Sequence, residues 1–386
     1  MTENLFAADY KNQPYWWEAA PQPTLPPIAP PASCDVAVVG SGYTGLCAAI
    51  ELARGGRNVV VLDAEDAGFG CSTRNGGQVS TSIKPYYDEL AERHGKEIAF
   101  AIRREGFNAL AWIEDFIARE KIDCNWERVG RFHGAHNSAA FDKLVHDVTH
   151  QTKGLEVEAH VVPKGEQRGE IGTDRYFGGV VYPHHASLHP AKYHAGLLAR
   201  AQAAGATFVT RCPVLSIGRE GDGFRLTTPR GSLQARDVVV ATNGYTGAIT
   251  PWLRRRVVFG GRVALKETDP KVSAPRLHAH MTNIFPELAA TKVSHSWMGF
   301  VAYTFDTLPH LGRMNDGLYY CAGYCGSGVS LASYFGTRLG QQILGKPEGR
   351  TALDGVSFPT RPFYSGNPWF LGPTIVYYKI RDKLNM

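Results

Sequence analysis

A glycine-rich turn between a short apolar strand and a helix limits the fold of this chain more than any other feature. The apolar run at 35–39 predicts a buried strand, and the turn at 40–45 leads into a helix expected over 46–54. A second apolar strand, expected over 58–62, ends at Asp63. Strand, turn, helix, strand and terminal acid follow the order of a βαβ unit, so the sequence predicts a Rossmann-type dinucleotide site.

Three glycines of this turn have separate physical roles in such a site. Gly40 lets the chain turn sharply, Gly42 removes a side chain that would collide with a pyrophosphate, and Gly45 lets the helix pack closely on the strand. The start of the helix adds free backbone N–H groups and the positive end of its dipole. Two more candidate cofactor-binding residues stand there, Tyr43 and Thr44.

The acid at the end of the second strand narrows the choice of cofactor. Asp63 can accept hydrogen bonds from ribose hydroxyls, which disfavours a cofactor that carries a 2′-phosphate. This unit alone does not distinguish FAD from NAD as the cofactor.

Composition limits the remaining functional classes. The chain has 386 residues, enough for two domains, and its formal charge of +5 is too small an excess to indicate nucleic acid binding. The seven cysteines are odd in number and scattered, which favours reduced thiols in a cytoplasmic protein over a disulfide framework. We expect no secretory signal, and the apolar runs are too short to span a membrane.

The first 33 residues form a proline-rich arm in which no regular element is expected. Trp16 and Trp17 are expected to pin this arm onto the main body of the protein. Beyond the βαβ unit, apolar periodicity and turn residues predict further elements. The expected helices lie at 86–119, 139–152, 190–204 and 329–344, and the expected strands at 208–217, 224–228, 237–241 and 318–322, the first two of these strands being antiparallel.

Four ordered motifs resemble the D-amino acid oxidase and glycine oxidase superfamily of FAD-dependent oxidoreductases. They are the flavin loop at 70–78, the second nucleotide-binding strand at 238–244, the segment at 306–312 and the last flavin turn at 323–329. Within that superfamily, Trp16-Trp17 and the stretch at 296–300 resemble the gamma-glutamylputrescine oxidoreductase branch. The resemblance covers nearly the whole chain.

The resemblance implies an α/β fold in which a Rossmann-type FAD-binding domain is assembled from separated segments. A second, antiparallel-sheet (α+β) domain would hold the substrate over the flavin. The expected FAD-binding segments are 34–122, 184–250 and 307–386, and the expected substrate-domain segments are 123–183 and 251–306.

The same resemblance assigns further residues to the cofactor. Those expected near the pyrophosphate are Ser72, Thr73 and Arg74, where the arginine would face the phosphate charge. Those expected along the flavin, the adenine and the second nucleotide strand are Asn75, Gly76, Gly77, Val214, Thr242 and Asn243. The last glycine turn would place a helix N-terminus beside the flavin N1–C2 oxygen region through Gly323, Gly326, Ser327, Gly328 and Val329.

The implied chemistry is oxidation of a carbon–nitrogen bond in an amine or amino acid. Hydride would pass to flavin N5, the imine would hydrolyse, and dioxygen would be reduced to hydrogen peroxide. The residues expected on the flavin or substrate face are Gln78, Trp297, Tyr303 and Tyr324. We expect non-covalent FAD, because the stretch 296–306, where some relatives attach flavin, has no cysteine. No metal is expected, because His184, His185 and His189 lack a completing carboxylate or cysteine.

One departure from the family pattern concerns the substrate domain. Val257-Val258 run directly into Phe259-Gly260-Gly261-Arg262, where relatives have several intervening strands, so we expect a shortened sheet. Three functional hypotheses therefore remain. The protein is an oxidase, a dehydrogenase of the same fold that uses a quinone or carrier, or a flavin-binding protein inactivated by the missing segment. The sequence identifies neither the amine substrate nor the oligomeric state.

Overall fold

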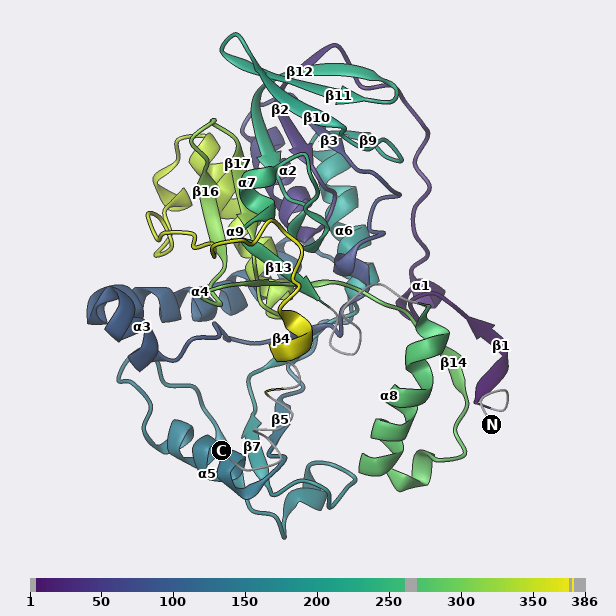
Figure 1. Ribbon diagram of the computed structural model, residues 1–386, viewed down its shortest axis with the longest axis vertical. Helices are drawn as coiled ribbons and strands as arrows, with labels where there is room; N and C mark the ends of the chain where they lie inside the picture. The colour runs from purple at the N-terminus through teal and green to yellow at the C-terminus, as the bar shows by residue number, and fades with distance from the viewer. Residues whose placement is uncertain (1–4, 261–268, 375–376, 378–386) are drawn as a thin grey trace.

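The centre of the molecule is an eight-stranded sheet (Figure 1). The computed structural model describes residues 5–260, 269–374 and 377. The strand order is β10-β11-β12-β2-β3-β9, with β17 paired to β12 and β16 paired to β17. The strands are β2 (Ser33–Val39), β3 (Val59–Leu62), β9 (Thr207–Val209), β10 (Ser216–Glu220), β11 (Gly223–Thr228), β12 (Gly231–Val240), β16 (His310–Arg313) and β17 (Tyr319–Ala322).

The middle of this sheet is parallel. β9, β3, β2, β12 and β17 run in the same direction, with Val38 opposite Val61 and Val239. All four residues of β3 are fully buried, because the sheet is covered on both faces. β10, β11 and the first half of β12 form an antiparallel meander, and the apolar cluster behind it includes Phe224 and Leu233.

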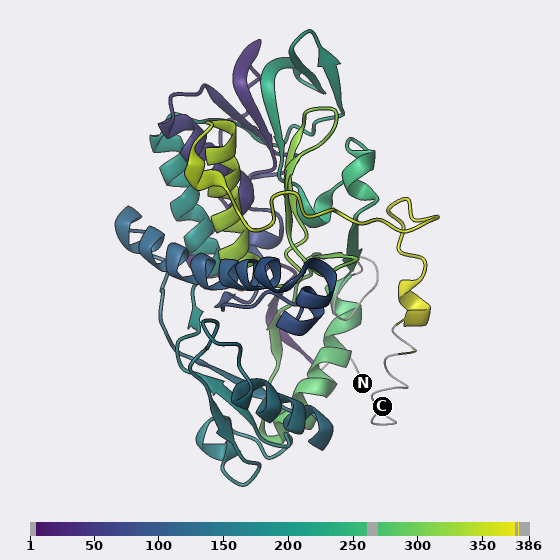
Figure 2. The ribbon, with the colours of Figure 1, turned by 90° about the vertical axis from the view of Figure 1, so that its left-hand side faces the viewer.

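Four helices lie on the other side of the parallel strands (Figure 2): α2 and α9 pack on the strands, α6 packs on α2, and α4 packs on α9. They are α2 (Tyr43–Arg54), α4 (Lys96–Glu120), α6 (Pro190–Ala203) and α9 (Gly328–Ile343). In α2 and α9 the apolar side chains are buried almost all round, since each helix lies between the sheet and another helix. This layered α/β arrangement is the one the sequence predicts.

A second region lies below the large sheet in Figure 1. Its three-stranded antiparallel sheet has the order β5-β7-β6 and carries α5. These elements are β5 (Arg131–Gly134), β6 (His160–Val162), β7 (Gly179–Tyr182) and α5 (Ser138–Thr149). The short pair β4 (Gln78–Val79) and β8 (Ala186–Ser187) links this sheet to the loop that follows η1 (Cys71–Thr73).

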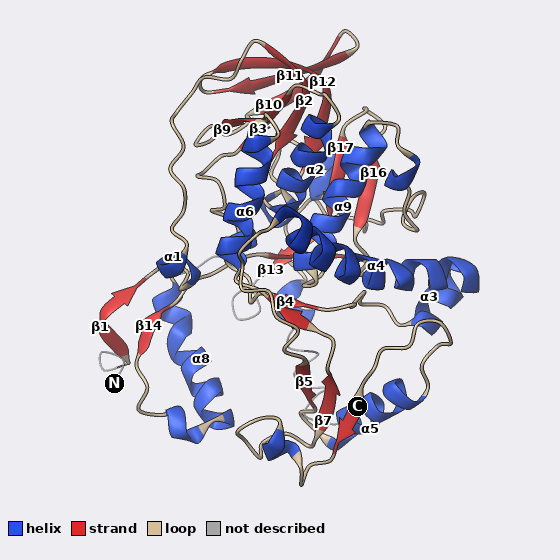
Figure 3. Cartoon of the chain, turned by 180° about the vertical axis from the view of Figure 1, so that it is seen from behind, coloured by secondary structure: helices blue, strands red, loops and turns tan. Residues whose placement is uncertain are grey.

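The remaining strands are short, and each pairs with a single partner strand. β13 (Val257–Gly260) pairs with β15 (Val301–Thr304), and β1 (Phe6–Lys11) pairs with β14 (Val293–His295). β14 and α8 stand apart from β5 and β7 in both face-on views (Figures 1 and 3). The remaining helices are α1 (Trp16–Ala19), α3 (Tyr87–His94), α7 (Pro251–Arg254) and α8 (Pro270–Ile284).

The strands β5, β6 and β7 and the strands β13 and β15 form two separate small sheets. Among the described residues, β13 forms a two-stranded sheet with β15 and does not join β5, β6 and β7 in a larger one. Gly261 and Arg262 of the junction lie outside the described residues. No helix in the described part of the chain combines the length and the apolar composition that crossing a bilayer requires.

Two sequence predictions about local structure are wrong. The arm does contain regular elements, because residues 6–11 precede its first proline and pair with β14. The expected strand at 208–217 is two strands: β9 runs parallel to β3, whereas β10 runs antiparallel to β11. Pro213, which has no N–H to donate to a strand neighbour, lies between them.

The arm is fastened to the loop at 70–77 by its tryptophans, as expected. Trp16 Nε1 donates to Asn75 O at 2.9 Å, and Trp17 Nε1 donates to Thr73 Oγ1 at 3.0 Å. The Arg74 guanidinium lies 5.2 Å from the centre of the Trp17 ring and 4.5 Å from that of Phe69. The arm therefore helps to hold this loop in place.

We predict that Trp17→Ala lowers the free energy of unfolding by about 2 kcal/mol, because it removes a hydrogen bond, a cation–π contact and packing together. Urea unfolding followed by circular dichroism measures this change. Trp369→Ala is the matched control, since Trp369 is 67% exposed, and it should change stability little. Equal effects of the two substitutions would contradict the role assigned to the arm.

Candidate cofactor and substrate site

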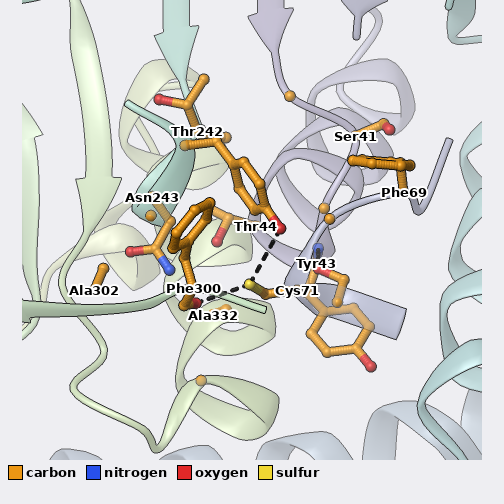
Figure 4. Close-up of a pocket in the computed structure, with 18 of the residues that line it drawn as sticks. Ser41, Tyr43, Thr44, Phe69, Cys71, Thr242, Asn243, Phe300, Ala302 and Ala332 are labelled. Atoms are coloured by element: carbon orange, nitrogen blue, oxygen red, sulfur yellow. Dashed lines mark hydrogen bonds between the residues drawn. The ribbon is translucent and has the colours of Figure 1, made fainter. Parts of the chain in front are cut away.

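A cavity of about 710 Å³ lies at the carboxyl ends of the parallel strands (Figure 4). β2, β3 and β12 end there and continue into Gly40, Asp63 and Ala241, all of which line the cavity. Carboxyl ends of parallel strands meet at one edge of a sheet, which is where doubly wound folds bind ligands. The volume suits a large organic ligand.

The glycine turn is required by close backbone contacts. Gly40 has a φ of +106°, and a Cβ there would lie 2.9 Å from Ala241 O. A Cβ on Gly45 would lie only 1.9 Å from Gly40 O. Because backbone oxygens are the colliding atoms, neither clash can be relieved by turning a side chain away. These contacts bring the first turn of α2 onto the ends of β2 and β12.

Two helix N-termini converge on this cavity. α2 begins after Gly42, which has no side chain, and α9 begins after Ser327, whose side chain accepts no hydrogen bond from its helix. The first N–H of α2, on Tyr43, donates to Ser72 Oγ at 3.0 Å. Thr44 of α2 and Val329 of α9 both line the cavity. The described lining residues include no Lys, Arg or His. Backbone N–H groups and helix dipoles are thus the features of this cavity that favour an anionic ligand.

The acid at the end of β3 is held in a defined orientation. Asp63 Oδ2 accepts from Ser41 N at 2.8 Å and from Ser41 Oγ at 2.6 Å, and Oδ1 accepts from Glu65 N at 3.0 Å. A carboxylate has further lone pairs, so Asp63 can also accept from a ribose hydroxyl. Val214, expected at the adenine, lines the same cavity.

The cavity brings together most of the expected cofactor residues. Those that line it are Gly40, Gly42, Tyr43, Thr44, Asp63, Ser72, Asn75, Val214, Thr242, Asn243, Gly326, Gly328 and Val329. Those that do not are Gly45, Thr73, Arg74, Gly76, Gly77, Gly323 and Ser327. Three of these glycines make close contacts beside the cavity residues. A Cβ on Gly45 would meet Gly40 O, and one on Gly77 would meet Leu188 O. Gly323 N donates to Asn243 Oδ1 at 2.9 Å.

Two expected phosphate ligands have other partners in the structure. Thr73 Oγ1 donates to Gly68 O at 2.5 Å and accepts from Trp17. Arg74 donates to Phe69 O and to Met298 O, at 2.7 and 3.0 Å. Both side chains hold the loop in place, and neither lines the cofactor cavity.

The four residues expected on the flavin or substrate face lie in different places. Tyr324 lines the cavity, and its hydroxyl lies 2.5 Å from Thr44 Oγ1, joining the turn after β17 to α2. Trp297 Nε1 donates to Arg74 O at 3.0 Å, and Tyr303 is 40% exposed; neither lines a described cavity. Gln78 lines a second cavity, of about 750 Å³.

Sequence reasoning missed a cluster on the cavity wall. The Cys71 thiol donates to Phe300 O at 2.8 Å and lies 3.5 Å from the Tyr245 hydroxyl oxygen (Figure 4). These residues come from three distant segments, and all three line the cavity. Of the three residues, only Cys71 lies in a sequence motif, the flavin loop at 70–78.

The three histidines considered for a metal site are separated by the structure. His184 bonds Glu158 at 2.6 Å, His189 Nδ1 accepts from Lys192 N at 3.2 Å, and the His185 ring stacks on Tyr182. Across the part of the chain that the structure describes, no group of three or more His, Cys, Asp or Glu side chains is arranged to hold a metal ion.

The residues present fit FAD. Two convergent helix N-termini match an anionic pyrophosphate and the region of a flavin that becomes negative on reduction. A fixed carboxylate matches a ribose, and glycines leave room where a Cβ would meet backbone.

Comparison with known proteins agrees with this geometry. The chain matches the sequence model of a family described as FAD dependent oxidoreductase over residues 35–250 and 247–342. It is 28% identical over 420 residues to the probable oxidoreductase OrdL of Rhizobium meliloti, covering 95% of this chain and 97% of that protein. It is 26% identical over 408 residues to gamma-glutamylputrescine oxidoreductase of Escherichia coli, covering 92% and 94%.

Both alignments are longer than the 386 residues of this chain, so both relatives carry residues that it lacks. Solved structures share the fold. Glycine oxidase from Geobacillus kaustophilus superposes with a TM-score of 0.70 at 19% identity, covering 86% of this chain and 99% of that one. L-proline dehydrogenase from P. horikoshii gives 0.67 at 16% identity, covering 89% and 99%. The family predicted from the sequence motifs is confirmed.

We predict that Gly45→Ala abolishes most FAD binding, because its Cβ would displace Gly40 and with it the start of α2. The visible absorbance of the purified protein, relative to its protein content, measures the bound flavin. Gly218→Ala is the matched control, since a Cβ there meets no atom within 4 Å. Full flavin content in Gly45→Ala would show that the turn does not set the cofactor site.

Proposed function

The chain belongs to the FAD dependent oxidoreductase family, and we propose that it oxidises a carbon–nitrogen bond in an amine or amino acid. The likeness to gamma-glutamylputrescine oxidoreductase and to glycine oxidase supports this class of substrate. Within the class, we propose a gamma-glutamylputrescine-like amine as the substrate and dioxygen as the electron acceptor.

One observation carries the proposal: the cofactor cavity and the second cavity share Gly326, in the turn before α9. Ser327 and Gln78 line the second cavity beside it. The N-terminus of α9 therefore lies where the two cavities meet. A substrate in the second cavity would lie next to the part of the cofactor cavity that α9 makes electropositive.

Bound FAD would supply the two-electron acceptor for carbon–nitrogen oxidation and return the electrons to dioxygen. The protein's contribution is to bind and orient. The N-terminus of α2 holds the anionic end of the cofactor, Asp63 fixes a ribose, and the N-terminus of α9 stabilises negative charge at the junction of the cavities. No strong general base is needed if the amine enters neutral.

The proposed division of the chain follows the sheets. We assign 34–122, 184–250 and 307–386 to cofactor binding, and 123–183 and 251–306 to substrate binding. In support, the strands of the large sheet fall almost wholly in the first set, and β5, β6, β7, β13 and β15 fall in the second. We also propose a cytoplasmic location, which the seven free cysteines support.

Anaerobic gamma-glutamylputrescine should bleach the visible flavin bands, and air should restore them with about one hydrogen peroxide per turnover. A spectrophotometer and a peroxidase-coupled assay measure both. Bleaching without peroxide in air would replace the oxidase with a dehydrogenase that uses a quinone or carrier. Bands that persist with gamma-glutamylputrescine and with a panel of amines and amino acids would refute the proposal and favour a flavin-binding protein inactivated by the shortened second sheet.

We also propose that FAD is bound without a covalent link. Cys325 lines the cofactor cavity, but burial raises the pKa of its thiol, which donates to Gly323 O at 3.1 Å. A protonated thiol is a poor nucleophile. Acid precipitation should therefore release all the yellow colour into the supernatant, and colour that stays in the pellet would show a covalent bond. Cys71→Ser and Cys325→Ser would then identify the attachment point.

A further inference from the structure

A segment near the carboxyl terminus, 358–366, is fastened to the chain between α7 and β13. Thr360 Oγ1 donates to Arg255 O at 2.6 Å. The Tyr364 hydroxyl donates to Val257 O at 2.8 Å, and Tyr364 is only 3% exposed. In Figure 2 this segment, drawn in yellow, lies at the outer edge of the molecule. These contacts hold the turn at 361–364 in one position on the surface.

This turn keeps an aromatic residue in an unfavourable backbone conformation. Tyr364 N donates to Arg361 O at 3.2 Å, which closes a four-residue β-turn. Phe363, the third residue of the turn, has a φ of +61°. Glycine or asparagine is usual at such a position, because a bulky side chain is crowded there. Phe363 is also 96% exposed, so packing within the described protein does not offset the strain. Strain and full exposure at one apolar residue indicate a role beyond folding.

A second exposed ring stands on the same aromatic base. Trp369 is 67% exposed, and the centroid of its ring lies 5.8 Å from that of Phe370. The Phe370 ring in turn lies 5.8 Å from Tyr364 and 6.2 Å from Phe305. We call Phe363 and Trp369 the aromatic tip. Because the inner rings hold it in place, the tip loses little conformational entropy on binding.

Arginines without an ion pair flank the aromatic tip. Arg255 and Arg361 are exposed, Arg254 is half-buried, and none of the three makes an ion pair in the described part of the chain. The Arg361 guanidinium lies 5.6 Å from the centre of the Phe305 ring, in the aromatic base. From position 355 to the end, the sequence has four basic residues and one acid, Asp382. The surroundings of the tip are therefore positively charged.

Exposed aromatic rings beside unpaired arginines match the surface of an anionic lipid bilayer. Aromatic rings insert among lipid headgroups, and arginines are attracted to anionic lipids. A protein partner fits less well, because two aromatic side chains bury about 300–500 Å², whereas a stable interface takes about 800 Å² from each partner. A second copy of this chain is also disfavoured, because a symmetric contact would bring like charges together.

We propose that the aromatic tip, with Arg255 and Arg361 beside it, binds the surface of an anionic lipid bilayer. The two rings enter the headgroup region, and the arginines contact lipid phosphates. The protein then lies on the membrane and does not cross it. Anionic lipids are concentrated in the cytoplasmic leaflet, which agrees with the cytoplasmic location proposed above. The inference does not depend on which amine the protein oxidises.

Vesicle sedimentation with the FAD-loaded protein tests the proposal. Vesicles of phosphatidylcholine and phosphatidylglycerol in about equal amounts should bind the protein at least ~10-fold more tightly than vesicles of phosphatidylcholine alone. High salt should weaken this binding, because it screens the arginine charges. Arg361→Gln should weaken binding to the mixed vesicles about 5-fold, because it removes one charge near the lipid surface.

The substitution Phe363→Gly separates lipid binding from folding. Glycine accepts the positive φ, so this variant should unfold at nearly the same temperature, yet bind the mixed vesicles about 10-fold more weakly. Trp369→Ala should weaken binding by a similar factor, about 10-fold. The matched control is Phe177→Ala. Phe177 is an exposed ring beside Lys164 in another region of the chain, just before β7, so its loss should leave vesicle binding unchanged.

The fluorescence of Trp369 reports insertion of the tip. Lipids with brominated acyl chains should quench the tryptophan fluorescence of the bound protein, and Trp369→Phe should remove most of that quenching. Failure to bind the mixed vesicles, or unchanged binding by folded Phe363→Gly, would overturn the proposal. A lipid-free dimer that dissociates in Phe363→Gly would also overturn it, because the tip would then be a contact between two copies of the chain.

Discussion

The close approach of backbone segments at Gly40 is the constraint on which the rest of the site depends. The turn packs against Ala241 at the end of β12, and Gly45 packs against Gly40 O from the other side. Backbone atoms cannot rotate out of such contacts, so the start of α2 has one position relative to the sheet. That position fixes where the N-terminus of α2 can bind an anion. The N-terminus of α9, which is distant in the sequence, lies at the same cavity.

Features with local signals could be predicted from the sequence. β2, the glycine turn, α2 and β3 lie within one short segment, and its periodicity and glycines predict a βαβ unit. Features that depend on distant partners could not. Arg74 sits in a loop that resembles a phosphate site, but besides the nearby Phe69 its partners are Trp17 and Met298, and the latter lies 224 positions further along the chain. Neither neighbour can be read from the loop itself.

The second cavity shows the same limit more sharply. Arg131 and Tyr182 meet only through the β5–β7 register, and neither belongs to a motif. The histidines at 184, 185 and 189 are conspicuous in the sequence because they are close together, yet they serve three separate purposes. His185 packs on Tyr182, while His189 accepts from the backbone at the start of α6. Closeness along the chain does not give these three rings a common partner.

The two cavities differ in the groups that line them. Among the described residues, helix termini and N–H groups line the cofactor cavity, whereas Lys84, Arg103 and Arg131 line the second. The position of Arg131 in this cavity depends on one ladder, because β5 pairs only with β7 in the described structure. A slip of one residue would turn Arg131 to the opposite face. The polar lining of the second cavity therefore depends on the register of a four-residue pair of strands.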